Sequence, residues 1–210
     1  MSAEMVAMVS IEFHDLAKRY NRRQVFSGLN GLLREGQSLV ITGANGSGKS
    51  TLERVLCGLA RPSRGQVAVH LDGVALEPAD CRREIGLVAP DLSLYGELTA
   101  EENLAFFARV RGLELAKQDF ARMLERVGLA GRGGDPVREY SSGMRQRLKY
   151  AQALLHRPRL LFLDEPTANL DEAGSAIVAD IIAEQKKRGI LVLATNEPEE
   201  VAFGDEVLRL

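Results

Sequence analysis

The chain has 210 residues, 45% of them hydrophobic, so it is long enough to bury a substantial core. Its formal net charge of -2, with both signs mixed along the chain, argues against a protein that binds nucleic acid mainly through phosphate contacts. Cys57 and Cys81 lack the spacing of a metal site and are too few for a disulfide framework, so we expect small core residues in a reducing compartment.

The N-terminal segment, residues 1–10, has no basic residue and carries Glu4 in its weakly apolar run, so it is not predicted to be a signal peptide. No stretch of the sequence approaches the roughly 18 apolar residues that cross a bilayer. Any role at a membrane would therefore require a partner.

Short apolar runs alternate with segments of helical period along the rest of the chain. Four runs are typical of strands buried on both faces, and the C-terminal run adds a further strand: 38–42, 85–88, 160–163, 190–195 and 206–210. This alternation predicts an α/β fold with a mainly parallel sheet. Residues 64–76 alternate in polarity around Asp72 and Gly73, which is a hairpin signal, so we expect an antiparallel β portion beside that sheet.

The middle of the chain, about 98–155, is predicted to be a helical insertion. Thr99 and Glu102 form a capping-box pattern that opens a helix, and its apolar residues, Val110 among them, fit one buried face. A second helical segment and a glycine-rich loop follow. We therefore expect a single domain of residues 1–210 in which a helical subdomain interrupts the α/β core.

The most specific motif is GANGSGKST, which fits G-x-x-x-x-G-K-[S/T] and lies between a predicted strand and a predicted helix. Glycines let successive backbone N–H groups curl around phosphate oxygens, and the helix N-terminus adds partial positive charge. Lys49 would reach the β and γ phosphates, and Ser50 would hold Mg²⁺. The alternative is a glycine-rich turn that only connects strand and helix. The residues predicted to bind the nucleotide here are Gly43, Ala44, Asn45, Gly46, Ser47, Gly48, Lys49, Ser50 and Thr51.

A second motif, LLFLDEP, places Asp164 and Glu165 directly after an apolar strand. Ligands of open α/β folds collect at this edge of the sheet. Asp164 would bind Mg²⁺ through its water shell, and Glu165 would polarise the water that attacks the γ phosphate. A solvated turn is the alternative interpretation. Together the two motifs indicate a phosphate-loop NTPase.

A third stretch, YSSGMRQRLKYAQALL, closely precedes LLFLDEPTANLD, and the pair resembles the signature helix, Walker B strand and D-loop of ATP-binding cassette (ABC) ATPases. The resemblance covers nearly the whole chain. Ser141 and Gly143 occupy the most telling positions of the Leu-Ser-Gly-Gly-Gln signature, whereas Ser142 and Met144 depart from it. The resemblance implies that Ser141 and Gly143 cover the γ phosphate held by a second subunit, so that two ATP molecules join two cassettes head to tail. A simple helix cap is the alternative.

The resemblance assigns roles to further residues and also reveals two departures. Tyr20 matches the aromatic residue that stacks on adenine, with a core or surface tyrosine as the alternative, and Asp171 matches the D-loop aspartate or is a helix N-cap, or both. Pro90 stands where most members have glutamine, and Asp91 is the nearest polar substitute. Asn196 replaces the usual switch histidine, so its amide cannot carry positive charge and we expect slow ATP hydrolysis.

The resemblance implies the ATP-hydrolysing subunit of an ABC transporter, using ATP and Mg²⁺, with a second ABC subunit, an integral membrane permease and no nucleic acid as partners. It would lie peripherally on the cytoplasmic side of the cell membrane, with no appended domain. The permease would dock beside residues 89–99, where Leu92, Leu94 and Tyr95 are either contacts or core residues. A fainter resemblance points to the haem exporter of cytochrome c maturation, and other small exporters are nearly as similar. A soluble ABC ATPase, for example of Fe–S assembly, or a slow nucleotide-binding regulatory cassette are the alternatives.

Overall fold

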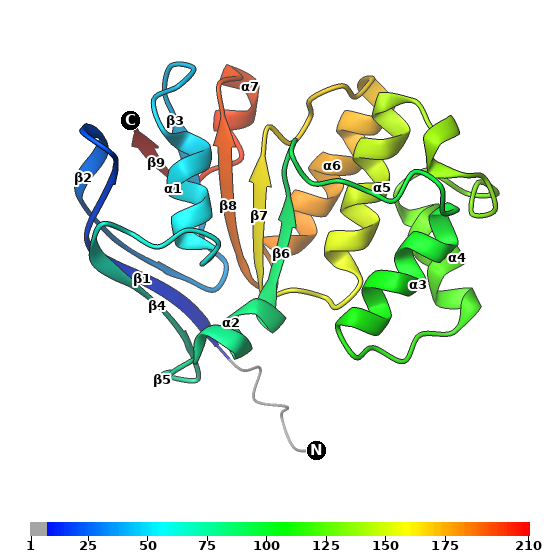
Figure 1. Ribbon diagram of the computed structural model, residues 1–210, viewed down its shortest axis with the longest axis horizontal. Helices are drawn as coiled ribbons and strands as arrows, with labels where there is room; N and C mark the ends of the chain where they lie inside the picture. The colour runs from blue at the N-terminus through cyan, green and yellow to red at the C-terminus, as the bar shows by residue number, and fades with distance from the viewer. Residues whose placement is uncertain (1–7) are drawn as a thin grey trace.

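The structure is a computed structural model that describes residues 8–210; most of the segment considered as a signal peptide, residues 1–7, lies outside the described part. The chain forms two sheets and a group of helices that lie side by side in Figure 1. The strands are β1 (Val9–Tyr20), β2 (Arg23–Arg34), β3 (Ser38–Thr42), β4 (Arg64–Leu71), β5 (Val74–Ala75), β6 (Ile85–Val88), β7 (Leu160–Asp164), β8 (Ile190–Thr195) and β9 (Glu206–Arg209). The helices are α1 (Lys49–Leu56), α2 (Pro78–Glu84), α3 (Ala100–Val110), α4 (Lys117–Arg126), the 3₁₀ helix η1 (Val137–Glu139), α5 (Ser142–Leu154), α6 (Glu172–Gln185) and α7 (Pro198–Val201).

The parallel sheet has the strand order β6-β7-β8-β3-β9 and occupies the centre of Figure 1. Its central strands are buried along their whole length, which explains why they read as continuous apolar runs. Thr42 pairs with Thr195, and Asp164 pairs with Ala194, so β3, β7 and β8 end at the same edge. The predicted α/β fold with a mainly parallel sheet is confirmed, and this edge carries the loops that follow all three strands.

The antiparallel sheet has the order β2-β1-β4-β5 and lies at the left of Figure 1. The predicted hairpin is present: Asp72 and Gly73 both have positive φ, 53° and 78°, and form the two-residue turn between β4 and β5. β1 also belongs to this sheet. Its regular alternation is interrupted at Asp15, where φ is 49° and the pairing with both neighbouring strands shifts register.

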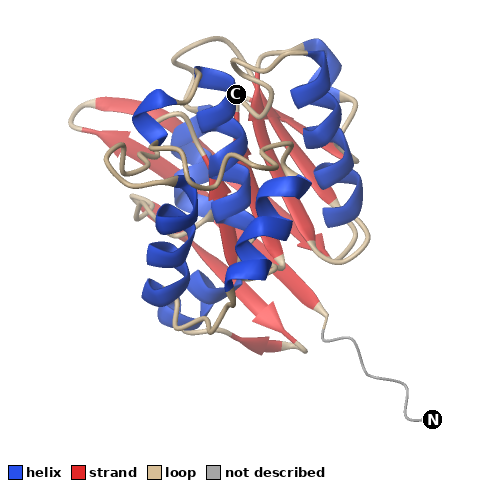
Figure 2. Cartoon of the chain, turned by 90° about the vertical axis from the view of Figure 1, so that its right-hand side faces the viewer, coloured by secondary structure: helices blue, strands red, loops and turns tan. Residues whose placement is uncertain are grey.

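The helices α3, α4 and α5 fill the part of the chain predicted to be helical, and they stand in front of the strands in Figure 2. The capping box is confirmed, because Thr99 Oγ1 accepts from the Glu102 N–H and Glu102 returns a bond to the Thr99 N–H. Val110 is 68% exposed, so its assignment to the buried face was wrong. It is the last residue of α3, where the helix has already left the core.

Alternate residues of the central strands point into two cores on opposite faces of the parallel sheet. Leu161, Leu163 and Leu193 pack in the core that also holds the helices α3 to α6, whereas Phe162 and Val192 pack in the core that holds α1 and the antiparallel sheet. Each strand is therefore fixed in register from both sides, since a slip of one residue would exchange the two faces. This rigid support positions the loops at the carboxyl edge.

Candidate functional site

A cavity of about 530 Å³ lies where the β1–β2 hairpin, the β3–α1 loop and the end of β7 meet. Three segments far apart in the sequence therefore supply its walls. The lining residues are Tyr20, Arg23, Gln24, Val25, Asn45, Gly46, Ser47, Gly48, Lys49, Ser50, Thr51 and Glu165.

The β3–α1 loop has a conformation that requires glycine at two positions. Gly43 and Gly48 have φ values of 152° and 113°. A Cβ on Gly43 would lie 2.5 Å from the Leu210 carbonyl oxygen, and a Cβ on Gly48 would lie 2.2 Å from Val25 Cγ1. Since Gly48 is the N-cap of α1 and caps it with no side chain, the first N–H groups of the helix face the loop, which is the arrangement that binds anions.

Polar atoms inside the loop are poised for a ligand. Lys49 is only 6% exposed, and its Nζ donates to the carbonyl oxygens of Gly43 at 2.9 Å and Ala44 at 3.4 Å. Ser47 Oγ is buried without a hydrogen-bond partner among residues 8–210. A buried hydroxyl of this kind is costly unless something outside the chain bonds to it, so the loop fits a phosphate group.

Asp164, the last residue of β7, lies next to Ser50 of α1. Asp164 is 4% exposed, and this burial raises the pKa of its carboxyl group, while a hydrogen bond from the Ser50 side chain opposes that shift. The buried carboxylate and the half-buried hydroxyl together form the hard oxygen set that Mg²⁺ prefers. A bound cation would favour the charged form of Asp164.

Glu165 lies at the junction of cavities. Its side chain is exposed, its φ is 51°, and its backbone N–H donates to the Ala194 carbonyl oxygen at 2.9 Å. It also lines a neighbouring cavity of about 710 Å³, together with Asn45 and Asn196. The Asn196 side-chain amide donates to the Asn45 side chain, so the end of β8 is bonded directly to the β3–α1 loop.

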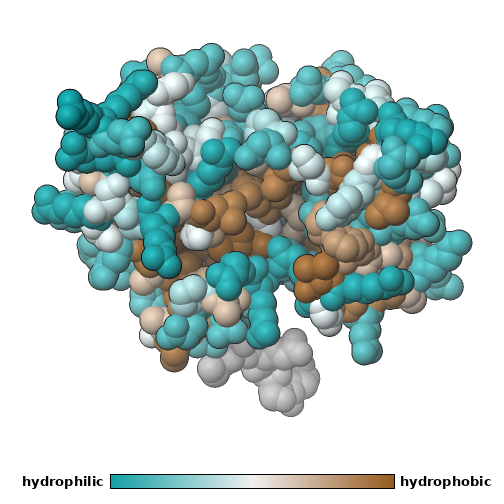
Figure 3. Space-filling view, in the orientation of Figure 1, coloured by the Kyte–Doolittle hydropathy of each residue, from teal (hydrophilic) through white to brown (hydrophobic). Residues whose placement is uncertain are grey.

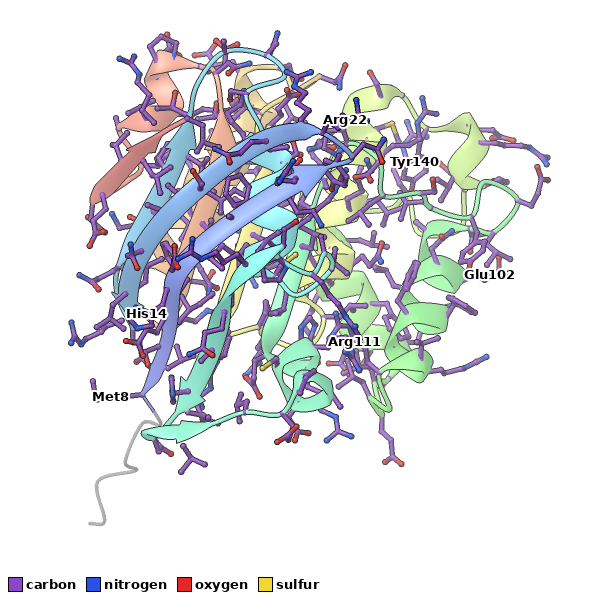
Figure 4. All side chains as sticks on the ribbon, turned by 60° about the vertical axis from the view of Figure 1, so that its left-hand side comes forward. Met8, His14, Arg22, Glu102, Arg111 and Tyr140 are labelled. Carbon is purple, nitrogen blue, oxygen red and sulfur yellow. The ribbon has the colours of Figure 1, made fainter. Side chains whose placement is uncertain are left out.

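Tyr20 ends β1 and is 52% exposed, which rules out the interpretation as a core tyrosine. Lys18 Nζ lies 4.9 Å from the centroid of its ring. The tip of the hairpin beyond it carries Arg22, which is labelled in Figure 4. Because the Tyr20 side chain is half exposed and lines the cavity, its ring is accessible to a ligand there.

Ser141, Gly143 and Asp171 lie together at a second place, at the start of α5 and of α6, and line neither cavity. Ser141 is an N-cap that accepts from the Met144 N–H at 3.2 Å, and Asp171 is an N-cap that accepts from the Gly174 N–H at 2.8 Å. A Cβ on Gly143 would approach the Asn169 carbonyl oxygen to 3.0 Å. The small residue thus lets the start of α5 pack closely against the loop that follows β7.

The turn that contains Pro90 is held by its backbone. Lys149 of α5 donates from Nζ to the carbonyl oxygens of Ala89 at 2.9 Å and Pro90 at 3.0 Å. Asp91, the predicted polar substitute, accepts from Arg54 of α1 at 2.8 Å. The Asp91 carboxylate is therefore already engaged by Arg54, which lies one helical turn beyond Ser50 in α1.

The sequence did not reveal Glu53 as part of this region. Glu53 is 1% exposed, and burial, followed by the nearby Asp164 charge, raises its pKa well above the ordinary value. Its Oε1 is buried without a hydrogen-bond partner among the described residues. Glu200, Tyr150, Thr167 and Thr195 were also missed. Glu53 and Glu200 stand among other polar residues of short helices, and Thr195 ends a strand, so none of them gives a sequence signal that separates it from a solvated neighbour.

The fold and the cavity define a phosphate-loop nucleotide-binding protein, because a glycine-shaped loop between a parallel strand and a helix places a lysine, a serine and two acidic residues at one edge. The family model described as ABC transporter matches residues 26–168. The chain therefore belongs to the ABC transporter family as its ATP-binding cassette, and the resemblance deduced from the motifs is confirmed.

Relatives and solved structures agree with this assignment. The linearmycin resistance ATP-binding protein LnrL of Bacillus subtilis is 33% identical over 92% of this chain and 63% of its own length. The daunorubicin resistance ATP-binding protein DrrA3 of Streptomyces coeruleorubidus is 38% identical over 94% of this chain and 63% of its own length. The chain thus spans less than two thirds of these relatives. A solved structure described as an ATP binding subunit of an ABC transporter matches with a TM-score of 0.83 and 29% identity, covering 95% of this chain and 85% of that one.

Between Met8 and Leu210, no helix has the length and apolar character that crossing a membrane requires.

Proposed function

We propose that the chain, a single cassette of residues 1–210 with a helical subdomain at about 98–155, binds and hydrolyses ATP to drive transport by a separate membrane subunit. The observation that carries the proposal is the convergence of Lys49, Glu165 and Tyr20 on one cavity. This cavity provides an aromatic surface, a cradle for phosphate groups and an acidic group at one edge of a rigid sheet. Those three elements match the three parts of a nucleotide undergoing phosphoryl transfer.

In this proposal the nucleotide extends from Tyr20 to the β3–α1 loop. Adenine stacks on the Tyr20 ring, a contact that contributes roughly 1–3 kcal/mol for a base on an aromatic side chain. The phosphates accept from N–H groups of the β3–α1 loop and of the first turn of α1, and Lys49 exchanges its two carbonyl partners for phosphate oxygens. Ser50 and Asp164 would hold Mg²⁺, which would supply positive charge against the phosphates.

Glu165 is the candidate general base, since its carboxylate is exposed at the cavity while its backbone is held in the sheet. Asn196 lies across the neighbouring cavity and would donate to a γ-phosphate oxygen after releasing Asn45. An amide stabilises developing negative charge less than an imidazolium does, so we expect slow turnover with nucleotide binding intact.

A second copy would complete the site. Ser141 and Gly143 lie at the exposed start of α5, away from their own phosphate loop, which suits a cap placed over the nucleotide of a second subunit. Asp171 would lie in the same interface. Because one chain carries both halves, two equivalent copies suffice.

The permease would dock on the face shown in Figure 3, where apolar side chains line a hollow between the sheets with α1 and the helices α3 and α5. Tyr95 is 49% exposed and Phe106 39% exposed, with ring centroids 4.9 Å apart. Leu94, in contrast, packs against the core. A pair of aromatic rings in edge-to-face contact at the surface suits a contact with a helix of the membrane subunit. In this proposal the protein lies peripherally on the cytoplasmic side of the membrane.

The transported molecule is proposed from the relatives. Two of them are named for resistance to linearmycin and to daunorubicin, which favours export of a small toxic compound over export of haem.

The dimer and hydrolysis are tested with Glu165→Gln, which keeps the shape of the base but removes its charge. With ATP and Mg²⁺ this variant should elute as a dimer that retains ATP, whereas wild type hydrolyses ATP and returns to monomer. Adding Ser141→Ala should lower the dimer fraction without abolishing ATP retention. Lys49→Ala should retain no nucleotide. An ATP-loaded Glu165→Gln protein that stays monomeric would overturn the head-to-tail site.

The permease contact is tested by purification from native membranes. The double change Tyr95→Glu and Phe106→Glu should abolish co-purification of a multi-span protein while ATP binding persists. Val74→Glu is the matched control, since Val74 is 67% exposed on β5 of the antiparallel sheet. Equal co-purification of both variants would contradict the proposed surface.

A further inference from the structure

Glu165 has a backbone conformation that an L residue adopts only when its surroundings impose it. Its φ of 51° is in the left-handed region, although it is neither glycine nor asparagine. Such residues persist where neighbouring contacts over-determine them, and they cluster at functional sites. The contacts that hold the Glu165 turn are therefore of mechanistic interest.

The first contact comes from α5. Tyr150 is 1% exposed, and its hydroxyl donates to the carbonyl oxygen of Pro166 at 2.8 Å. Pro166 is itself buried and directly follows Glu165. Tyr150 lies on the same helix whose first turn begins after Ser141, so one rigid element connects the two positions.

The second contact comes from α7. Glu200 is 4% exposed, and one of its oxygens accepts both the backbone N–H of Thr167, at 3.1 Å, and the Thr167 hydroxyl. Its other oxygen accepts the Thr195 hydroxyl. Glu200 thus joins the turn after β7 to the end of β8.

The Thr195 hydroxyl continues this connection past Asn196. Besides donating to Glu200, its Oγ1 accepts the backbone N–H of Glu197 at 2.9 Å. Asn196 lies between these two bonded residues. The same buried carboxylate therefore fixes the backbone on the C-terminal side of Glu165 and on both sides of Asn196.

We propose that Tyr150 and Glu200 are positioning residues that hold Glu165 and Asn196 in their working geometry, an inference that rests on the proposed function of those two residues. Glu200 sets the separation of the two loops, and Tyr150 ties the Glu165 turn to α5. Because α5 would present Ser141 to the nucleotide of a second subunit, movement of that helix reaches the base of its own subunit through Tyr150. The two ATP sites of a dimer are coupled by this hydrogen bond.

A purely structural role makes a different prediction. Loss of a buried hydrogen bond destabilises any protein, and it would lower activity only in proportion to unfolding. A positioning role predicts a lower kcat in fully folded protein, with KM for ATP and affinity for ADP unchanged, since the phosphate loop and Tyr20 are not touched.

The test uses three variants that each remove a hydroxyl or a donor with little change of volume. Tyr150→Phe removes the bond to Pro166, and Thr195→Val removes the bond to Glu200, while Thr195→Ser retains it. Gln185→Met is the control, because Gln185 is 1% exposed and donates to carbonyl oxygens of Pro158, Arg159 and Ile190 at the opposite end of the same strands.

Tyr150→Phe and Thr195→Val should lower kcat by about tenfold or more, since misplacement of a reacting group by about 1 Å costs on the order of 10²-fold. Thr195→Ser and Gln185→Met should stay within about twofold of wild type in folded protein. Tyr150→Phe should also lower the Hill coefficient for ATP toward one. Deuterium exchange without nucleotide should accelerate in the peptide that covers Glu165 to Leu170 in the first two variants only.

The outcomes separate this proposal from the proposed function. Wild-type kcat and unchanged exchange in Tyr150→Phe and Thr195→Val would overturn the positioning role while leaving the ATPase intact. Equal losses in Gln185→Met would reduce the effect to stability and overturn it as well. A wild-type chain that binds no ATP would overturn both proposals.

Discussion

Replacing Gly48 by alanine tests whether the phosphate loop is shaped by glycine or only tolerates it. The backbone of Gly48 has φ 113° and ψ 12°, and an added Cβ would lie 2.2 Å from Val25 Cγ1. A left-handed conformation costs an L residue about 1–2 kcal/mol. Overpacking in a filled site typically adds about 1–3 kcal/mol. Gly48→Ala should therefore lower the free energy of unfolding by about 2–5 kcal/mol, a large part of the ~5–15 kcal/mol that stabilises a typical protein.

Two further variants separate the conformational term from the steric term. Gly58 has φ 76° and no heavy atom within 4 Å of its virtual Cβ, so Gly58→Ala should lose only the conformational part, about 1–2 kcal/mol. Val25→Ala removes the atom that clashes. In the double variant Gly48→Ala with Val25→Ala, we expect a favourable coupling of about 1–3 kcal/mol, because the two changes relieve each other.

Urea unfolding measures the stability of wild type and of all four variants, and calorimetry with ATP measures binding. Gly48→Ala should also weaken ATP binding by more than about tenfold, because the N-terminus of α1 must shift, and the double variant should recover part of that loss. Additive stabilities in the cycle, or a Gly48→Ala protein no less stable than Gly58→Ala, would refute the reasoning from the Val25 contact.

Two other predictions concern side chains. Asn196→His should raise kcat by about tenfold or more, because removing one donor to developing charge changes rates by about 10²–10³ and a histidine can add a positive charge; no gain in a folded variant would contradict this. Burial, with a smaller effect of the Arg111 charge, lowers the pKa of His156 to about 4, and its Nε2 bonds to the Ile85 carbonyl oxygen at 2.9 Å. The unfolded chain, with a histidine pKa of about 6.5, binds more protons below that pH, so the free energy of unfolding should fall between pH 6.5 and 4 and not change from this cause above it. His156→Gln, which keeps a donor, should flatten the curve measured by urea unfolding from pH 7 to 4, and an unchanged slope would contradict the assignment.

The strands that support the site could be predicted because each is buried on both faces. The run 160–163 needs no partner information, since its residues are apolar throughout and 0% exposed in the fold. The helix α2 could not be predicted in the same way. It has no buried residue, and its proline and charged side chains are typical of a loop. In the fold, Arg111 at the end of α3 donates to the Arg82 and Ile85 carbonyl oxygens at the end of this helix (Figure 4), a contact that the local sequence does not reveal.

The predictable part of the site is the part that is local in sequence. The sequence alone identifies residues 43–51, Asp164 and Glu165, because a phosphate cradle and a strand end each need a fixed spacing. Glu200 and Tyr150 do not give such a signal, because Thr167 and Pro166, the residues that they hold in the turn after β7, are 33 and 16 residues away and meet them only after the sheet has formed. The roles of residues 43–51, Asp164 and Glu165 toward phosphate, metal and water stay predictions, as do those of Ser141 and Asp171.

The turn at Pro90 shows how backbone contacts compensate for a missing side chain. Arg54 and Asp91 form a salt bridge at 2.8 Å, but their side chains are 42% and 64% exposed, and a surface pair of this kind contributes only about 0–1 kcal/mol. Lys149 makes two charge-assisted bonds to carbonyl oxygens from a half-buried position, and such bonds contribute about 1.5–3 kcal/mol each. The turn is therefore attached more firmly to α5 than to α1. The backbone of residues 89 and 90 is thus bonded directly to α5, whose N-cap is Ser141.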